Sequence, residues 1–287
     1  MINNSHNIEK AYKNAIEFTK SHYENFPVIS VFVKKSLRKH VAVFYQFARQ
    51  ADDIVDEGEK KFDEKISQLD EYEDCLNNAF NNNFQNEFWA AVKNTVDLFN
   101  LSPKNFKDLL KAFRQDITKS RYHDFTELLN YCSNSANPVG RVILELNNIH
   151  DENLLQYSDD ICTALQLTNF WQDVSIDFEK DRIYLPLNDM KEFGIREKDI
   201  EQKKYGENFK KLMKLEIDRT RKLFFEGRKL IKHLPGRLKY QIYWTVLGGE
   251  KILDKIERND YNSLNLRPRL FKTDYIQLLI KSLFGLR

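Results

Sequence analysis

Apolar residues recur at three- and four-residue spacing along almost the whole chain, and this helical rhythm limits the fold more than any other feature. Residues that break helices or make tight turns are scarce, with 9 glycines and 6 prolines among 287 residues. Glycine and proline each make up less than half of their usual shares in proteins, which are about 7% and 5%. Because sandwiches, barrels and propellers need many tight turns, the sequence excludes them and predicts an all-α protein.

The rhythm predicts a series of helices joined by short connections. They cover residues 7–21, 36–57, 61–82, 86–99, 104–119, 124–148, 157–178, 207–233, 237–258 and 273–285. Pro138 and Gly140 predict a kink or break inside one of them, and Ser102-Pro103 is typical of a helix start. Residues 183–194 should form an irregular connection. With no repeat, linker or low-complexity segment, we expect a single domain over residues 1–287.

The charge balance and the cysteine pattern exclude several classes of protein. The 45 basic and 43 acidic residues give a net charge of +2, too small to attract nucleic acid strongly. The N-terminal residues lack the apolar core of a signal peptide, and no run of about 18 apolar residues occurs. The 3 cysteines are far apart and form no C-x-x-C pair. We therefore expect a cytoplasmic protein that binds no nucleic acid.

The second expected helix carries an acidic stripe. Asp52 and Asp56 are four residues apart, so their carboxylates share one helical face. Tyr45 and Arg49 extend this face toward the start of the helix, whereas Asp53 is turned away from Asp52 by about 100°. Like charges at this spacing weaken an isolated helix, and a hard cation would reverse the sign of that effect.

A second stripe lies on the expected helix 157–178. Gln166, Asn169, Asp173 and Asp177 fall on one face, bordered on both sides by apolar residues. All four side chains offer oxygen ligands, and no histidine or cysteine joins them. This donor set suits Mg²⁺ and disfavours Zn²⁺.

Either stripe alone would ordinarily be solvated helix surface, but two stripes of this kind favour a binding site. Mg²⁺ uses one or two carboxylates and shares its other positions with water and substrate phosphates. Two aspartate pairs facing each other across a bundle would hold Mg²⁺ around a diphosphate. Arg182 and Tyr184 follow the second stripe and offer the donors that a departing diphosphate needs. Asp181 lies where the rhythm breaks, so we leave it outside the site.

Longer motifs around these residues resemble a known family. The stretches ARQADDIVDE (48–57) and LQLTNFWQDVSIDFEKDRIYLP (165–186) resemble the two aspartate motifs of the squalene/phytoene synthase family. Tyr261, Arg267 and Arg269 are similar to its C-terminal basic segment. The stretches 24–30, 112–122, 131–140 and 169–174 resemble one branch, the bacterial hydroxysqualene synthases of hopanoid biosynthesis.

The resemblance implies an isoprenoid-synthase-type helical bundle around a central cavity, and a function. That function is the Mg²⁺-dependent conversion of presqualene diphosphate to hydroxysqualene by ionisation, carbocation rearrangement and capture by water. The implied Mg²⁺ ligands are Asp52, Asp56, Asn169, Asp173 and Asp177. The implied diphosphate contacts are Arg49, Arg182, Tyr184 and Arg267. The implied lining and catalytic residues are Tyr45, Arg49, Tyr131, Gln166 and Trp171, with Phe26 near the mouth.

Two departures from the wider family disfavour the condensation of two prenyl diphosphates. Gln172 stands where such synthases usually have arginine, and Asn137-Pro138 stands where many have a small residue at the central kink. Both could supply polar groups that hold a water molecule. For Trp171, ordinary core packing is the alternative to contact with a carbocation.

Other functions remain open. A prenyl transferase of the same family would condense two farnesyl diphosphates to presqualene diphosphate, squalene or dehydrosqualene. A non-catalytic relative would act as a binding or assembly factor, although such a relative would be expected to lose stripe aspartates. The C-terminal apolar residues Tyr275, Ile276, Leu279, Ile280, Leu283 and Phe284 favour docking onto the bundle. Peripheral contact with the inner face of the membrane is the alternative, and enzymes of the squalene pathway are candidate partners.

Overall fold

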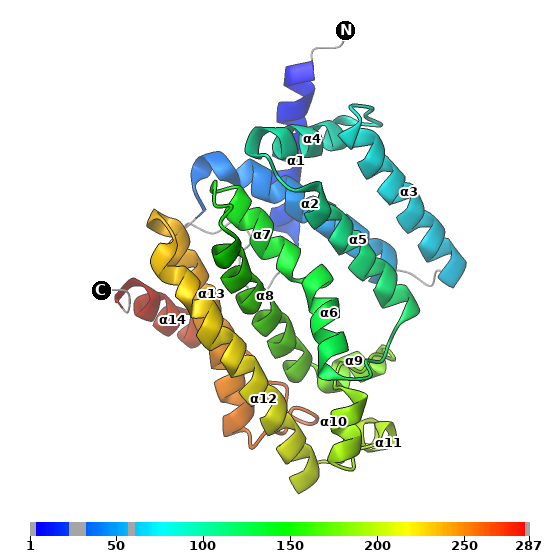
Figure 1. Ribbon diagram of the computed structural model, residues 1–287, viewed down its shortest axis with the longest axis vertical. Helices are drawn as coiled ribbons and strands as arrows, with labels where there is room; N and C mark the ends of the chain where they lie inside the picture. The colour runs from blue at the N-terminus through cyan, green and yellow to red at the C-terminus, as the bar shows by residue number, and fades with distance from the viewer. Residues whose placement is uncertain (1–3, 23–32, 57–60, 285–287) are drawn as a thin grey trace. The chain divides into compact units, whose positions relative to one another are not determined.

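The computed structural model describes residues 4–22, 33–56 and 61–284 and is all-α over these residues (Figure 1). The described residues form no strand, and a single isolated bridge joins Arg121 to Ile183. The predicted fold class is therefore confirmed. The chain divides into two compact units, Met1–Thr118 with Pro138–Asp151, and Lys119–Asn137 with Glu152–Arg287. Each unit is described by itself, and the single domain over residues 1–287 stays a prediction.

The first unit packs its helices around an aromatic core. Its elements are α1 (Asn4–Ser21), η1 (Lys35–Leu37), α2 (Arg38–Asp56), α3 (Phe62–Phe80), α4 (Glu87–Phe99), α5 (Pro103–Thr118) and most of α7 (Asn137–Glu145). Phe47 of α2 is fully buried and lies 5.1 Å from the ring of Phe106 and 6.2 Å from that of Trp89. Edge-to-face aromatic pairs of this kind add to the energy of burial. They hold α2, which carries the first acidic stripe, against α4 and α5.

The second unit is built around α8 (Glu152–Gln172). Its other elements are α6 (Phe125–Ser135), α9 (Val174–Glu179), α10 (Leu187–Glu192), α11 (Glu197–Glu201), α12 (Glu207–Gly227), η2 (Arg228–His233), α13 (Gly236–Arg258) and α14 (Lys272–Phe284). Helix α12 runs alongside α8 (Figure 1). A Cβ atom at Gly227 would lie 2.6 Å from Cγ1 of Ile161. Only glycine therefore permits this close approach of the two helices.

The predicted helices correspond to observed ones, with several differences in detail. The stretch 207–233 is divided into α12 and η2, and the short helix α11 was not predicted. The stretch 124–148 is interrupted at Ala136, beside the predicted kink. The stretch 157–178 is divided at Asp173 into α8 and α9. The connection 183–194 was predicted to be irregular, but it contains the short helix α10, which begins after Pro186. A helix of six residues is too short to be detected by its apolar period.

Helix α14 has one packed face and one exposed face. Leu278 is buried against Leu247 and Tyr243 of α13, and the carboxylate of Asp274 is paired with Lys255. The predicted docking is thus observed within the second unit. On the other face Ile276 and Ile280 are 60% and 52% exposed.

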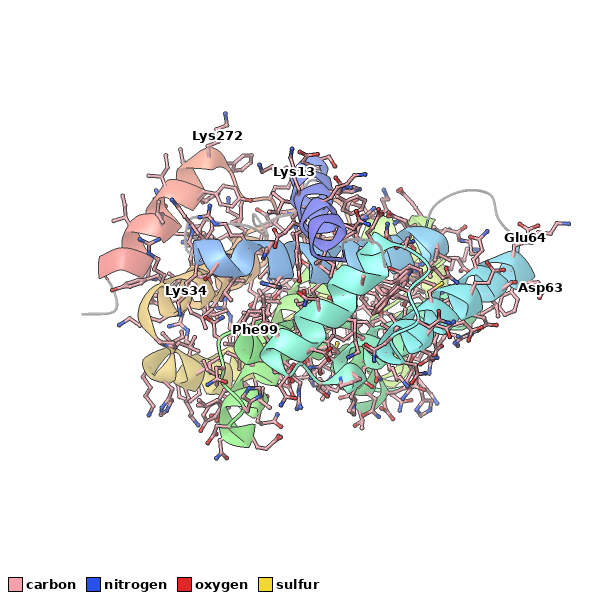
Figure 2. All side chains as sticks on the ribbon, turned by 90° about the horizontal axis from the view of Figure 1, so that it is seen from above. Lys13, Lys34, Asp63, Glu64, Phe99 and Lys272 are labelled. Atoms are coloured by element: carbon pink, nitrogen blue, oxygen red, sulfur yellow. The ribbon has the colours of Figure 1, made fainter. Side chains whose placement is uncertain are left out.

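The exposed residues from 271 to 281 include two lysines and no acid. Figure 2 shows Lys272 projecting outward from the start of α14. The side chains of Leu283 and Phe284 lie outside the described part of the chain. An apolar face flanked by lysines is typical of helices that lie on anionic lipid. None of the described helices is long and apolar enough to cross a membrane.

Peripheral membrane contact by α14 stays a prediction and can be tested directly. We expect Ile276→Gln combined with Ile280→Gln to lower cosedimentation with phosphatidylglycerol vesicles by at least about half, because the buried apolar area is lost. The matched control is Phe225→Gln, which changes a 70% exposed apolar residue on α12. Equal sedimentation of the double variant and the unmodified protein would contradict the prediction.

Candidate functional site

The first acidic stripe lies at the C-terminal end of α2. Arg49 donates from Nε to Oδ1 of Asp53 at 2.6 Å, and its Nη1 lies 3.5 Å from Oδ2 of Asp52. Asp56 is the last residue of the helix and is exposed. The ring of Tyr45 lies 6.4 Å from the rings of both Phe18 and His22 of the α1 end. Asp53, which is turned away from Asp52 on the helix, thus joins Asp52 in holding the Arg49 guanidinium in place.

The electrostatics of this helix end are unfavourable without a cation. The last turn of α2 contains no basic residue. Its carboxylates lie at the negative end of the helix dipole, where a negative charge costs roughly 0.3–1 kcal/mol. Arg49 offsets part of this charge through its pairs with Asp52 and Asp53. A bound cation near the carboxylates would offset the remainder.

The second stripe keeps its helical spacing across the break between α8 and α9. The N–H of Asp173 donates to the carbonyl of Asn169 at 3.0 Å, and the N–H of Asp177 donates to that of Asp173 at 2.8 Å. This pattern of bonds four residues apart keeps the three side chains on one side of the chain. Asn169 is exposed, while Gln166, Asp173 and Asp177 are half-buried. The second unit therefore brings these predicted residues together.

Asp177 is the most perturbed carboxyl group of the stripe. Burial, and next the charge of the neighbouring Asp173 carboxylate, raise its pKa from 3.8 to about 7, although Arg182 acts in the opposite direction. A desolvated carboxyl group beside a second carboxylate favours either a proton or a bound cation. Perturbed groups of this kind are typical of functional sites.

Arg267 forms a bidentate ion pair with Asp173. Its Nε donates to Oδ1 at 2.5 Å and its Nη2 to Oδ2 at 2.9 Å. The sequence predicted Arg267 as a diphosphate contact and did not predict this pairing. In the structure Arg267 neutralises one of the predicted metal ligands. Both carboxylate oxygens of Asp173 are thereby engaged.

An aromatic cluster lies directly beside Asp177. The rings of Phe170 and Tyr184 stack at 3.7 Å with an angle of 7° between their planes. Tyr122 and Tyr131 lie 5.7 and 6.0 Å from Tyr184, and Tyr131 is buried. The sequence predicted Tyr131 and Tyr184 but missed Phe170 and Tyr122. Phe170 lies between the predicted residues Asn169 and Trp171, and Tyr122 ends the family-like stretch 112–122.

Backbone hydrogen bonds fix the segment that carries Tyr184. Ile183 donates to the carbonyl of Ser120 at 2.9 Å, and Leu187 donates to that of Tyr122 at 2.9 Å. Asp181 adopts a φ of 56°, which lets the N–H of Arg182 bond back to the carbonyl of Asp177. The Asp181 carboxylate turns to Arg121 instead. Its position therefore agrees with its exclusion from the predicted site.

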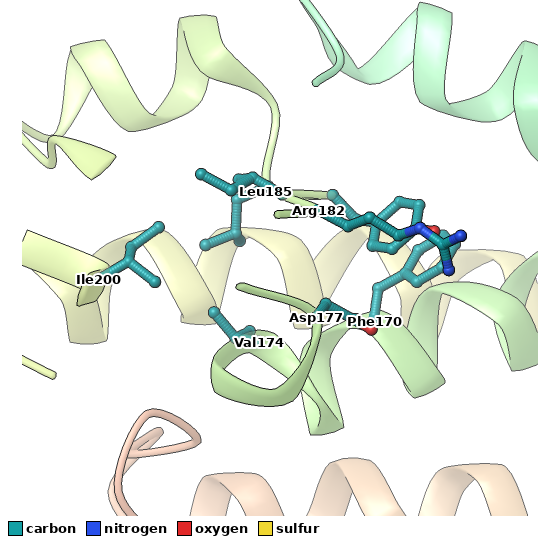
Figure 3. Close-up of a pocket in the computed structure, with 8 residues that line it drawn as sticks. Phe170, Val174, Asp177, Arg182, Leu185 and Ile200 are labelled. Atoms are coloured by element: carbon teal, nitrogen blue, oxygen red, sulfur yellow. The ribbon is translucent and has the colours of Figure 1, made fainter. Parts of the chain in front are cut away.

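Asp177, Arg182, Phe170 and Tyr184 line a small pocket of about 10 Å³, close to the space that one water molecule needs. Figure 3 shows Asp177 and Arg182 at the end of this pocket that holds the Phe170 ring, with Ile200 at the other end. Polar and aromatic groups thus meet at one place within the second unit.

Three polar or aromatic residues have a structural partner that the sequence did not predict. Trp171 is fully buried, and its Nε1 donates to Oγ1 of Thr220 on α12 at 2.8 Å. This contact corresponds to the core-packing alternative, so we do not retain Trp171 in the proposed site. Gln172 donates to the carbonyl of Pro268 at 2.7 Å. The side-chain carbonyl of Asn137 accepts from Thr163 at 2.9 Å.

These contacts change the interpretation of the two departures from the family pattern. The Gln172 amide and the Asn137 carbonyl were expected as groups that could hold a water molecule. In the structure each makes a buried hydrogen bond within the second unit instead.

The donor set fits Mg²⁺ within each unit. No group of three or more histidine, cysteine, aspartate or glutamate residues arranged to hold a metal occurs in the described parts of the chain. A carboxylate pair is nevertheless what Mg²⁺ usually takes from a protein, with water and phosphate as its other ligands. The buried Asp177 beside Asp173 gains most from such a cation. That the two stripes face each other stays a prediction. Phe26 and Glu57 lie outside the described residues.

Comparisons with known proteins agree with one another. The sequence model of squalene/phytoene synthases matches residues 19–274. Phytoene synthase 2 of Solanum lycopersicum is 30% identical over 92% of this chain and 87% of its own. The crystal structure of squalene synthase HpnC from Alicyclobacillus acidocaldarius is 37% identical, with a TM-score of 0.84 over 89% of this chain and 96% of that one.

A dehydrosqualene synthase is similar in fold, with a TM-score of 0.86 at 21% identity and 99% coverage of both chains. The chain spans about two thirds of the length of several of the plant phytoene synthases that it matches. The isoprenoid-synthase-type architecture that the sequence predicted is confirmed by these similarities.

The shifted pKa of Asp177 predicts a pH-dependent stability change. Between pH 3.8 and about 7 the folded protein keeps a proton that the unfolded chain has released. Stability contributed by the protonated group is therefore lost as the pH rises through this window. We expect Asp177→Asn, measured with a chelator present, to melt at least roughly 3 °C higher than the unmodified protein at pH 8. The advantage should shrink as the pH is lowered to 5.

Asp181→Asn is the matched control, because Asp181 is 85% exposed and lies four residues further along the chain. It should leave the pH dependence of melting unchanged. An Asp177→Asn protein that melts at or below the unmodified protein at pH 8 would contradict the assignment.

Proposed function

Because the chain belongs to the squalene/phytoene synthase family, we propose that it converts presqualene diphosphate to hydroxysqualene with the help of Mg²⁺. The reaction breaks the carbon–oxygen bond to diphosphate, rearranges the resulting cation and joins it to the oxygen of water. The bonding electrons leave with diphosphate, and the water proton is released. No reductant is needed for this balance.

One observation carries the proposal. The stacked rings of Phe170 and Tyr184 adjoin Asp177 and Arg182, which combine a buried carboxyl group with a guanidinium. In the proposed site the charged groups face the anionic leaving group and the aromatic rings face the carbocation. An aromatic face stabilises a cation by about 0.5–2 kcal/mol. The 37% identity to the squalene synthase HpnC adds support.

In the proposed mechanism the charged residues bind the leaving group and the aromatic residues control the cation. Asp52 and Asp56, and Asn169, Asp173 and Asp177, would hold Mg²⁺, which would supply Lewis acidity for the departure of diphosphate. Arg49 and Arg182 neutralise the diphosphate oxygens as they gain charge.

The buried rings of Phe170, Tyr131 and Tyr184 keep bulk water from the cation. Tyr45 and Gln166 line the space for the polyprenyl chain. In this proposal a single water molecule captures the rearranged cation as an alcohol.

Two other functions are alternatives to this proposal. The phytoene synthases at about 30% identity favour a condensation of two prenyl diphosphates. In that case two farnesyl diphosphates would give presqualene diphosphate, squalene or dehydrosqualene. A non-catalytic binding or assembly factor is the alternative from another class, and the retained aspartates of both stripes argue against it.

Product analysis separates these functions. Purified protein is incubated with Mg²⁺ and either presqualene diphosphate or farnesyl diphosphate, each with and without NADPH. We expect hydroxysqualene from presqualene diphosphate, with no effect of NADPH. Products from farnesyl diphosphate would favour the condensing enzymes, and the recovery of both substrates unchanged would contradict catalysis.

The metal assignment predicts the effect of removing single carboxylates. We expect Asp56→Asn and Asp173→Asn each to lower turnover at least about a hundredfold, because a lost metal ligand withdraws several kcal/mol of charge stabilisation. Circular dichroism should show unchanged helicity. Asp181→Asn, whose carboxylate pairs with Arg121, should keep full turnover. Full activity of either ligand variant would remove that residue from the assignment.

A further inference from the structure

The connection between α13 and α14 is fastened to the C-terminal end of α8 at two adjacent points. Arg267 forms its bidentate pair with Asp173. The next residue, Pro268, accepts a hydrogen bond of 2.7 Å from Nε2 of Gln172. Gln172 is 5% exposed and Pro268 is buried, so this bond is shielded from water. The last residue of α8 and the residue after it thus hold neighbouring residues of the connection.

Because Arg267 and Pro268 are adjacent, the bond from Gln172 to Pro268 also influences where Arg267 lies. Proline has a fixed φ, and the residue before it is confined to extended conformations. A hydrogen bond that fixes Pro268 therefore also fixes the backbone of Arg267. Because the Pro268 carbonyl is buried, it needs a hydrogen-bond donor. A side chain without a donor at position 172 would leave this carbonyl unsatisfied.

The ion pair also has a consequence for ligand binding. Both oxygens of Asp173 are engaged by the Arg267 fork, so a cation that binds this carboxylate must compete with the guanidinium. A diphosphate bound nearby would offer the guanidinium new acceptors in return. The same arginine can thus balance the charge of either Asp173 or a bound diphosphate.

We propose that Gln172 is a positioning residue that acts through Pro268 to place Arg267, which exchanges Asp173 for diphosphate when Mg²⁺ and substrate bind. The proposal rests on the proposed function, since it takes Asp173 as a metal ligand and a diphosphate as part of the substrate. It assigns to Gln172 a role that does not involve touching substrate, metal or water.

Two binding measurements with opposite expected signs test this role. Gln172→Met keeps the length of the side chain and removes the donor. With Arg267 less firmly placed on Asp173, Mg²⁺ alone should bind about threefold more tightly. Inorganic pyrophosphate, titrated in the presence of Mg²⁺, should bind roughly tenfold more weakly, the effect of one well-placed charged hydrogen bond. Calorimetry measures both without any polyprenyl substrate.

Thr168→Val is the matched control on the same helix. Thr168 is 2% exposed and donates to the carbonyl of Ala164, so the variant loses a buried hydrogen bond that is not directed at the connection. Both affinities should stay unchanged in it. Parallel weakening of both ligands in Gln172→Met, or no change in either, would overturn the proposal.

A double-mutant cycle with Arg267→Gln gives an independent test. Arg267 has a partly exposed side chain, so its substitution is readily tolerated by the fold. Once Arg267 is replaced, adding Gln172→Met should weaken pyrophosphate binding no further, because Gln172 acts through Arg267. An additional loss in the double variant would overturn the proposal.

The result of these binding measurements does not depend on which reaction the protein catalyses. If presqualene diphosphate is not a substrate, the calorimetric result with Mg²⁺ and pyrophosphate still decides the role of Gln172. Failure of the proposed function and failure of the positioning role are therefore distinguishable.

Discussion

A half-buried carboxyl group beside a second carboxylate is the constraint on which the candidate site depends. Burial and the charge of Asp173 raise the pKa of Asp177 to about 7. Such a pair is costly for a folded protein unless a proton or a cation compensates it. The positive charges of Arg267 and Arg182 reduce the electrostatic cost of this carboxylate pair. The two carboxylates favour the binding of a cation but lower the stability of the fold, a trade-off that is common at functional sites.

The rest of the second unit holds this costly group in place. Helix α8 is packed tightly against α12, where Gly227 permits close approach and Trp171 donates to Thr220. Two backbone hydrogen bonds fix the segment around Tyr184 beside the end of α8. A site on rigid elements keeps its geometry when the ligand is absent. The same rigidity brings the ring of Phe170 into contact with that of Tyr184.

Much of the fold could be predicted from the sequence because long amphipathic helices leave a period that is visible without a structure. The spacing of Asn169, Asp173 and Asp177 predicted a shared face, and the backbone hydrogen bonds preserve it across the break at Asp173. Short elements such as α10 contain too few apolar positions to show a period. Their existence depends on tertiary contacts instead.

Contacts between distant residues could not be predicted in the same way. Arg267 and Asp173 are 94 residues apart, and nothing in the local pattern of either reveals the other. The resemblance to a family identified Arg267 as a diphosphate contact, but only the structure shows its pair with Asp173. Gln172 was noticed as a departure from the family pattern. Its bond to Pro268 explains that residue in physical terms.

The first acidic stripe shows a different limit of prediction from sequence. Arg49 was predicted as a diphosphate contact from its place on the helical face. The structure adds that Asp53 and Asp52 hold its guanidinium. Offsets along a helix predict which residues share a face, but not which rotamers bring their charged ends together.

The central claim is that the buried Asp177 pair exists to bind a cation, and proton release on metal binding tests it most directly. Mg²⁺ is titrated calorimetrically at pH 6.5 into the protein with inorganic pyrophosphate, in two buffers of different ionisation enthalpy. A titration without protein and one with Asp177→Asn serve as references. Because Asp177 with a pKa of about 7 is largely protonated at this pH, binding should release about three quarters of a proton more than in either reference. Identical proton release by the unmodified protein and the Asp177→Asn variant would contradict the account.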